Sequence, residues 1–171
     1  MFKILACAAI LFSSTALGFL KAADFEKREK ILKHLKSDLD FIQNEITFML
    51  TPIDEIIGKL SHSDSELKIF YKSVYEKILQ NTDVPVSQIW LGETIKLAKV
   101  LPLTKSDADV LSLLGQSFGK SDVDGQISAI KTAFQSLNIQ LDSAVSDKNK
   151  NSRLFKSLGF YAGILIIVMF F

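Results

Sequence analysis

The chain carries a long apolar segment at each of its ends, and these two segments constrain its fold more than any other feature. The first segment covers residues 4–20 and is apolar except for three hydroxyl side chains, with Lys3 and Lys21 on either side of it. As a helix it extends roughly 25 Å, at about 1.5 Å per residue. That length is just sufficient to cross the hydrocarbon core of a bilayer.

The C-terminal segment, residues 154–171, is also long enough to cross a bilayer as a helix. Its one charged side chain is Lys156, whose aliphatic stem can extend toward the lipid headgroups. A helix at the core of a soluble protein normally keeps a polar stripe, which this segment lacks. We therefore expect membrane anchors at residues 1–20 and 154–171, and a separate domain at residues 21–153.

The first segment also has the features of a secretory signal peptide, namely a charged start and a short apolar run. In that alternative the protein is an exported helical protein with a cleaved signal peptide and a C-terminal membrane anchor. The flanking cations oppose export, because nearly all of them lie between the two segments rather than outside them. These cations are Lys21, Lys27, Arg28, Lys30, Lys148, Lys150 and Arg153, and Lys156 follows near the start of the second segment. The positive-inside tendency therefore predicts that residues 21–157 face the cytoplasm and that both termini lie outside.

Two glycines, Gly159 and Gly163, stand four residues apart near the start of the second apolar segment. Small residues at this spacing leave a flat helix face on which a second membrane helix can pack closely. The same pattern is common by chance in membrane helices, where the glycines simply face lipid. The pair is our candidate helix-packing site within the membrane.

The domain between the anchors begins and ends with a long amphipathic pattern. Apolar residues recur at alternating intervals of three and four residues, with charged and amide side chains between them. This spacing predicts long helices with a coiled-coil-like apolar seam. The first seam is Leu32, Leu35, Leu39, Ile42, Ile46 and Met49, and the second is Ile127, Ile130, Phe134, Leu137, Leu141 and Ala144.

Shorter helices are predicted between the two seams, because prolines and polar turns interrupt the chain there. Pro52 ends the first long helix and suits the first turn of the next one. Thr104 followed by Asp107 is typical of a capped helix start. We expect helices at about residues 53–60, 63–78, 86–100 and 105–118, and a last long helix from near Asp122. Candidate core residues of the helix at 86–100 are Ile89, Trp90, Ile95 and Leu97.

No segment alternates apolar and polar residues with a period of two, so we expect no β-sheet. The predicted fold is all-α: a cytoplasmic bundle of about six helices with long first and last helices, flanked by a transmembrane helix at each end. The first and last helices should pack antiparallel, because both lead to the same membrane face.

The sequence shows no residue pattern that is typical of catalysis or of metal or cofactor binding. The single cysteine, Cys7, lies in the first apolar segment and has no partner for an intramolecular disulfide. His34 and His62 are expected to be exposed and structural, and Trp90 to anchor a core or an interface. The net charge of +1 provides no bulk attraction to nucleic acid. We therefore predict that the protein is not an enzyme and binds no cofactor or small-molecule substrate.

Three groups of residues, taken in their order along the chain, resemble the stage III sporulation protein AB family. The groups are Leu39, Glu45-Ile46 and Thr51-Pro52; then Leu103, Ser106, Leu111, Leu114-Gly115, Gly119, Asp122 and Gln126; then Lys148-Asn149, Arg153 through Gly159, and Gly163. Trp90 also stands where that family carries a tryptophan. The resemblance covers the whole chain with both apolar ends, and its specificity comes from order and spacing rather than from one motif.

The resemblance implies a component of the channel apparatus that joins mother cell and forespore in spore-forming bacteria, placed in the mother-cell membrane around the forespore. The soluble domain of that family is similar to the cytoplasmic domain of the platform protein F of type II secretion systems. The implied role is a platform at the lipid bilayer. Its implied partners are other stage III sporulation channel proteins, including the cytoplasmic ATPase stage III sporulation protein AA.

Overall fold

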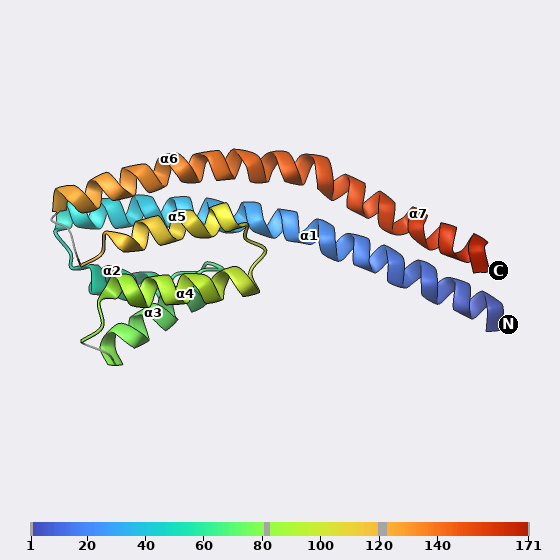
Figure 1. The fold of residues 1–171 in the computed structure, drawn as a ribbon, viewed down its shortest axis with the longest axis horizontal. Helices are drawn as coiled ribbons and strands as arrows, with labels where there is room; N and C mark the ends of the chain where they lie inside the picture. The colour runs from blue at the N-terminus through green and yellow to red at the C-terminus, as the bar shows by residue number, and fades with distance from the viewer. Residues whose placement is uncertain (1, 81–82, 120–122, 171) are drawn as a thin grey trace. The chain divides into compact units, whose positions relative to one another are not determined.

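A computed structural model describes residues 2–80, 83–119 and 123–170 of the chain (Figure 1). All regular secondary structure within these ranges is helical, as the sequence predicts, and no strand occurs among them. The helices form two units. Unit 1 comprises Met1–Glu29 and Ser143–Phe171, and unit 2 comprises Lys30–Asp142.

Two long helical segments contribute residues to both units (Figure 1). The first is α1 (Phe2–Asn44), which continues into a short π-helix, η1 (Glu45–Met49). The second consists of α6 (Val123–Asp147), the π-helix η2 (Lys148–Ser152) and α7 (Arg153–Phe170). The prediction of long first and last helices that include the apolar ends is therefore confirmed. The predicted start of the last long helix, near Asp122, lies outside the described residues.

Unit 1 is an antiparallel helix pair. Along α1 the contacts run from Leu11 through Gly18 to Arg28, while on the other segment their partners run backward from Gly163 to Asp147. Each long helical segment contains a stretch that could cross a membrane by its length and composition, and only 6% of each stretch is buried. Such low burial is not expected of the core helix of a soluble protein. A signal sequence would meet the same criteria, and the first stretch lies near the N-terminus. The C-terminal stretch is therefore the stronger indication of a membrane helix.

Unit 2 contains four shorter helices together with the inner parts of α1 and α6. These helices are α2 (Ile53–Leu60), α3 (Lys68–Gln80), α4 (Val86–Val100) and α5 (Lys105–Gln116). Each contacts the next along the chain, so α3 packs on α2 and on α4, and α4 packs on α5. Helices of this length are marginal alone, and their stability comes from the apolar face that each buries in the bundle.

The heptad seams of the two long helices are buried for most of their length. In the first seam every position from Leu32 to Ile46 is at most 4% exposed, but Met49 is 72% exposed. In the second seam Ile130, Leu137 and Ala144 are fully buried, while the alternate positions are half-buried. The seams therefore form core as predicted, and the first one ends one position earlier than its spacing indicates.

Two helix boundaries lie where the sequence places them and have identifiable caps. After η1 the backbone of Leu50 enters the left-handed region, with φ of 51°, and Pro52 then precedes α2. Thr104 caps α5: its hydroxyl accepts a hydrogen bond from the Asp107 amide, and the Asp107 carboxylate accepts one from the Thr104 amide. This reciprocal capping box satisfies two amides that the helix itself cannot pair.

Two details of the predicted helices are wrong. The third short helix begins at Lys68 rather than near Ser63, because the preceding serines form turns of their own and the Ser65 hydroxyl accepts a hydrogen bond from the Leu67 amide. In α4, Ile95 is 54% exposed, whereas its neighbour Thr94 is buried. Helical phase decides this outcome, since Trp90, Thr94 and Leu97 share one face and Ile95 lies about 100° away from Thr94.

Candidate functional site

The chemistry of the described residues is that of packing and ion pairing. Within the described ranges, no group of three or more His, Cys, Asp or Glu side chains could hold a metal ion. Cys7 is a half-buried free thiol, and His62 is exposed. His34 departs from the sequence-based expectation, since its side chain is only 33% exposed and its Nδ1 lies 2.8 Å from Oε2 of Glu66.

The first candidate site is the close contact between α1 and α7 in unit 1. A Cβ on Gly159 would lie 2.8 Å from the backbone oxygen of Ser14 and 2.9 Å from Cα of Gly18. Real Cβ atoms do not approach backbone so closely, so a side chain there would push the helices apart. The Ser14 hydroxyl also donates a 2.6 Å hydrogen bond to the Gly159 carbonyl. Gly163 lies one turn further, where a Cβ would lie 3.1 Å from Cδ1 of Leu11.

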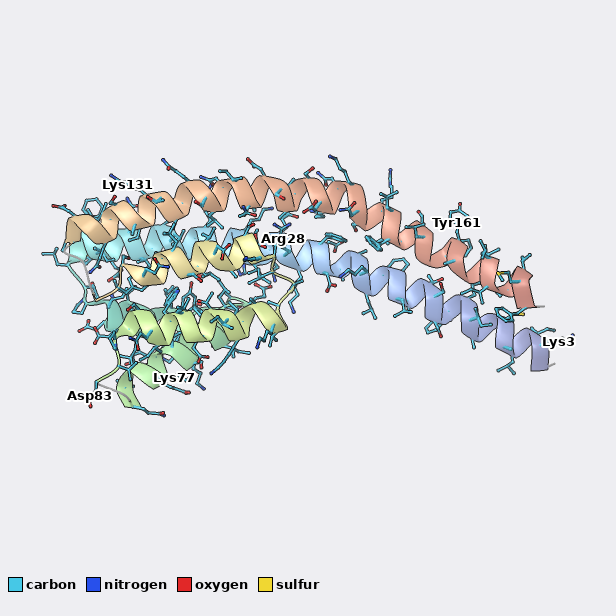
Figure 2. All side chains as sticks on the ribbon, in the orientation of Figure 1. Lys3, Arg28, Lys77, Asp83, Lys131 and Tyr161 are labelled. Carbon is cyan, nitrogen blue, oxygen red and sulfur yellow. The ribbon has the colours of Figure 1, made fainter. Side chains whose placement is uncertain are left out.

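A layer of ion pairs joins the same two segments next to this contact. The pairs are Arg28 with Asp147 at 2.8 Å, Glu29 with Lys148 at 2.7 Å and Glu26 with Lys156 at 3.2 Å. Arg28, labelled in Figure 2, has a side chain only 6% exposed. The hydrogen bond and the negative charge of Glu29 raise the pKa of Lys148. The aromatic rings of Phe25 and Phe155, 5.7 Å apart, add an apolar contact beside these charges.

Unit 2 is organised around Trp90, which is fully buried as a core anchor. Its indole meets the rings of Phe70 and Phe118 edge-on, with centroids 4.8 Å and 5.1 Å away. The indole N–H donates a 2.7 Å hydrogen bond to the carbonyl oxygen of Leu111 on α5. This bond satisfies the only polar atom of the side chain, so a large aromatic group can be buried without an unpaired donor.

A polar contact crosses this core from α1 to α3. The buried hydroxyl of Tyr71 donates a 2.8 Å hydrogen bond to Oδ2 of Asp38, whose residue is 8% exposed. Burial raises the pKa of Asp38, and the hydrogen bond from Tyr71 opposes that rise only in part. Burial and the neighbouring carboxylate raise the pKa of Tyr71 well above its ordinary value. The tyrosine is therefore the donor and the carboxylate the acceptor.

Glu93 is a buried ionic group of unit 2. Its side chain is 7% exposed and accepts hydrogen bonds from Lys77, Lys96 and Ser73. Burial alone would raise the pKa of Glu93, but the three hydrogen bonds outweigh it and lower the pKa to about 2. The carboxylate thereby ties α3 to α4 and fixes two lysines at the seam between these helices. Lys77 is labelled on α3 in Figure 2.

Sequence reasoning singled out Gly159, Gly163 and Trp90 but not Gly18, Asp38 or Glu93. Gly18 faces Gly159 in the structure, yet the two stand more than a hundred residues apart in the sequence. Glu93 stands between Trp90 and Leu97 at helical spacing, so the sequence places it on the buried face of α4. That position is the signal by which it could have been found. Asp38 likewise stands between Leu35 and Ile42 at helical spacing.

Comparison with known proteins gives one consistent result. A family model described as Stage III sporulation protein AB (spore_III_AB) matches residues 3–171. The chain is 27% identical over 169 residues to the stage III sporulation protein AB of Bacillus subtilis (strain 168), and the match covers 99% of each chain. A solved structure of a stage III sporulation protein AB has the same fold, with a TM-score of 0.65 at 20% identity. That match covers 72% of this chain and 98% of the other.

Proposed function

Because the chain belongs to the stage III sporulation protein AB family, we propose that it is a non-enzymatic membrane component of the channel apparatus between mother cell and forespore. In this proposal it lies in the mother-cell membrane that surrounds the forespore and acts as a platform for partner proteins. The observation that carries the proposal is the family match, which extends over residues 3–171 and so includes both apolar ends.

We propose further that both apolar stretches cross the bilayer and that the helical bundle faces the cytoplasm. The two stretches are long enough to span and are almost unburied, which supports insertion of both. The cations between them support the orientation through the positive-inside tendency. A domain held at two points keeps its orientation and a high local concentration at the membrane, as a platform requires. Its partners would be other stage III sporulation channel proteins, including the cytoplasmic ATPase stage III sporulation protein AA.

In this arrangement the contact of Gly159 with Gly18 holds the two membrane helices as a pair. Glycine on both sides allows the backbones to touch, which provides packing where no hydrophobic effect acts between helices. The ion pairs of Arg28, Glu29 and Glu26 would then stand at the cytoplasmic end of the pair, in or near the headgroup region.

Deletion of the gene in its spore-forming host tests the role. We expect engulfment to proceed while heat-resistant spores are lost, and reintroduction of the intact gene to restore them. Normal numbers of heat-resistant spores from the deletion strain would overturn the proposal.

The orientation has a separate test. In a Cys7→Ser background, a cysteine introduced at the exposed Lys131 should react with a membrane-impermeant maleimide only after the cells are opened. The cells are vegetative cells that express the chain, so that the outer face of its membrane is the cell surface, and a cysteine at Ile4 should therefore react before they are opened. The exported alternative predicts the reverse reactivity at residue 131, together with a mature chain that begins after the first apolar segment.

A further inference from the structure

The cations of unit 1 outnumber the carboxylates that are available to pair with them. Each of its four carboxylate side chains is held by one cation, in the pairs Lys21–Asp24, Lys156–Glu26, Lys148–Glu29 and Arg28–Asp147. Three further cations between the apolar stretches, Lys27, Lys150 and Arg153, are exposed and form no ion pair with any described residue. Unit 1 therefore carries unpaired positive charge where the proposed topology places the lipid headgroups.

Lys150 and Arg153 directly precede the apolar part of the second helical segment. Lys150 lies in η2, and Arg153 follows three residues later as the first residue of α7, so the two are neighbours on the helix surface. From residue 148 to the C-terminus the sequence contains no aspartate or glutamate. The α1 carboxylates that reach this segment are held by Lys148 and Lys156. An anion that balances Lys150 and Arg153 must therefore come from outside unit 1.

Exposed apolar side chains continue from these two cations along one face of α7. They recur at intervals of four, three and four residues, which places them on the same side of a helix. They are Leu154 at 56%, Leu158 at 58%, Tyr161 at 65% and Leu165 at 61% exposure. Tyr161 is labelled on this helix in Figure 2. Lys150 stands four residues before Leu154, within the wider turn of η2, and so heads the same face.

Lys27, the third of these cations, has different surroundings. It lies on α1, where Asp24 stands three residues earlier, so a carboxylate is its neighbour along the helix surface. That carboxylate is already shared with Lys21, whose Nζ lies 3.3 Å from it. Lys27 is therefore an exposed cation of the same unit with a carboxylate on its own helix face, which Lys150 and Arg153 lack.

We propose that Lys150 and Arg153 bind the phosphate of an anionic phospholipid, whose acyl chains lie along the exposed apolar face of α7. The inference rests on the proposed function, in which both apolar stretches cross the bilayer. Arginine holds a phosphate through its planar fork and lysine through a flexible ammonium group, and anionic leaflets attract cations that flank a membrane helix. A free phosphate ion would match the two charges, but only a lipid also covers the apolar face that continues from them.

Photo-crosslinking of the full-length chain tests the lipid site, in nanodiscs of phosphatidylcholine with a minor share of phosphatidylglycerol. The photoreactive residue p-benzoylphenylalanine is placed at Leu158, and at Leu20 of α1 as a control that is also exposed, at 66%. The two positions lie at similar depth, because Gly18 contacts Gly159. Mass spectrometry then identifies the captured lipid. We expect Leu158 to capture phosphatidylglycerol several-fold above its share of the bilayer and Leu20 to capture it close to that share. Equal capture at the two positions would overturn the proposal.

Single charge removals separate a defined site from a diffuse attraction. Lys150→Gln and Arg153→Gln should each reduce the preference at Leu158 several-fold, whereas Lys150→Arg should retain it. Lys27→Gln is the matched control, because it removes the same charge from the same unit and should leave the preference unchanged. All three residues are exposed, so these substitutions should not alter thermal unfolding. An equal loss in Lys27→Gln, or a loss on adding inorganic phosphate but not sodium chloride of the same ionic strength, would contradict a lipid site at Lys150 and Arg153.

The failure of this inference can be told apart from the failure of the proposed function. If carbonate washes the intact chain from membranes, or if Leu158 captures no lipid, the proposed topology fails and the lipid site fails with it. If Leu158 captures both lipids in proportion to their share of the bilayer, the topology is supported and only the lipid site fails.

Discussion

Gly115 has no side chain because the indole of Trp90 occupies the space where its Cβ would stand. A Cβ built at this position would overlap the pyrrole part of the ring, with Cδ1, Cγ and Nε1 as its nearest atoms. The same indole donates its N–H to Leu111 one turn earlier on α5, so the ring cannot move away without losing that hydrogen bond. Trp90 and Gly115 therefore set the distance between α4 and α5.

This relationship predicts that Gly115→Ala destabilises unit 2, although alanine is the better helix former. Overpacking of a filled core typically costs about 1–3 kcal/mol, which exceeds the gain in helix propensity. Thermal unfolding of the full chain in lipid nanodiscs, followed by circular dichroism, would measure the loss. Gly92→Ala is the matched control, because it adds the same methyl group to open space and should be stabilising. Equal effects of the two substitutions would contradict the steric account.

A second prediction concerns the dependence of stability on pH through Glu93. Its pKa is lowered to about 2 in the folded state from an ordinary value of 4.5. The unfolded state therefore binds more protons between these values, and the stabilisation is present above pH 4.5 and is lost as the pH falls toward 2. Glu93→Gln should lower the melting temperature at pH 7 and should weaken its decline between pH 5 and pH 3. Glu76→Gln, at an exposed position of α3, should change neither.

The contact between Asp38 and Tyr71 predicts an asymmetry between two conservative substitutions. The pKa of Asp38 is raised above its ordinary value of 3.8, so its negative charge destabilises the fold as the pH rises from that value through the folded pKa. Asp38→Asn keeps an acceptor for the Tyr71 hydroxyl and removes this charge, and should be neutral or stabilising at pH 7. Tyr71→Phe leaves the buried carboxylate without its donor and should cost about 1–3 kcal/mol. Equal destabilisation by both would contradict this assignment of donor and acceptor.

The glycine contact of unit 1 predicts that Gly159→Leu separates the paired ends of α1 and α7. A side chain at this position has no room against Ser14 and Gly18, whereas Ala162→Leu adds volume at an exposed position of the same helix. Spin labels at Ile4 and Met169, in a Cys7→Ser background in nanodiscs, would report the distance between the ends. We expect a longer and broader distance distribution for Gly159→Leu only. A distribution unchanged by Gly159→Leu would show that the contact does not hold the pair.

Periodicity was sufficient to predict most of the fold. The seams from Leu32 to Ile46 and around Leu137 are buried because spacing of three and four residues places them on one helix face. Pro52 and the Thr104–Asp107 cap are local signals, and the helices begin next to them. The start of α3 was predicted wrongly because several residues that could cap a helix follow one another before it.

What periodicity could not supply is the identity of the partner at each contact. Gly18 contacts Gly159, and the Trp90 indole fills the space beside Gly115. Both contacts depend on how distant helices are placed in three dimensions. The ionic group of Glu93 was missed for a related reason. A charged residue on a buried face is normally excluded, and only the convergence of Lys77, Lys96 and Ser73 makes its burial favourable.

The hydrogen bond from Ser14 to Gly159 joins residues 145 positions apart, and this separation has a consequence for synthesis. At about 5–20 residues per second, a ribosome needs roughly 7–30 s to deliver the second helix after the first. In the proposed topology the first helix therefore waits in the bilayer without its partner. During that interval its hydroxyls can bond only to carbonyls of their own helix, one turn earlier. The pair is thus completed only after the bundle between the two helices and the second helix itself have been synthesised.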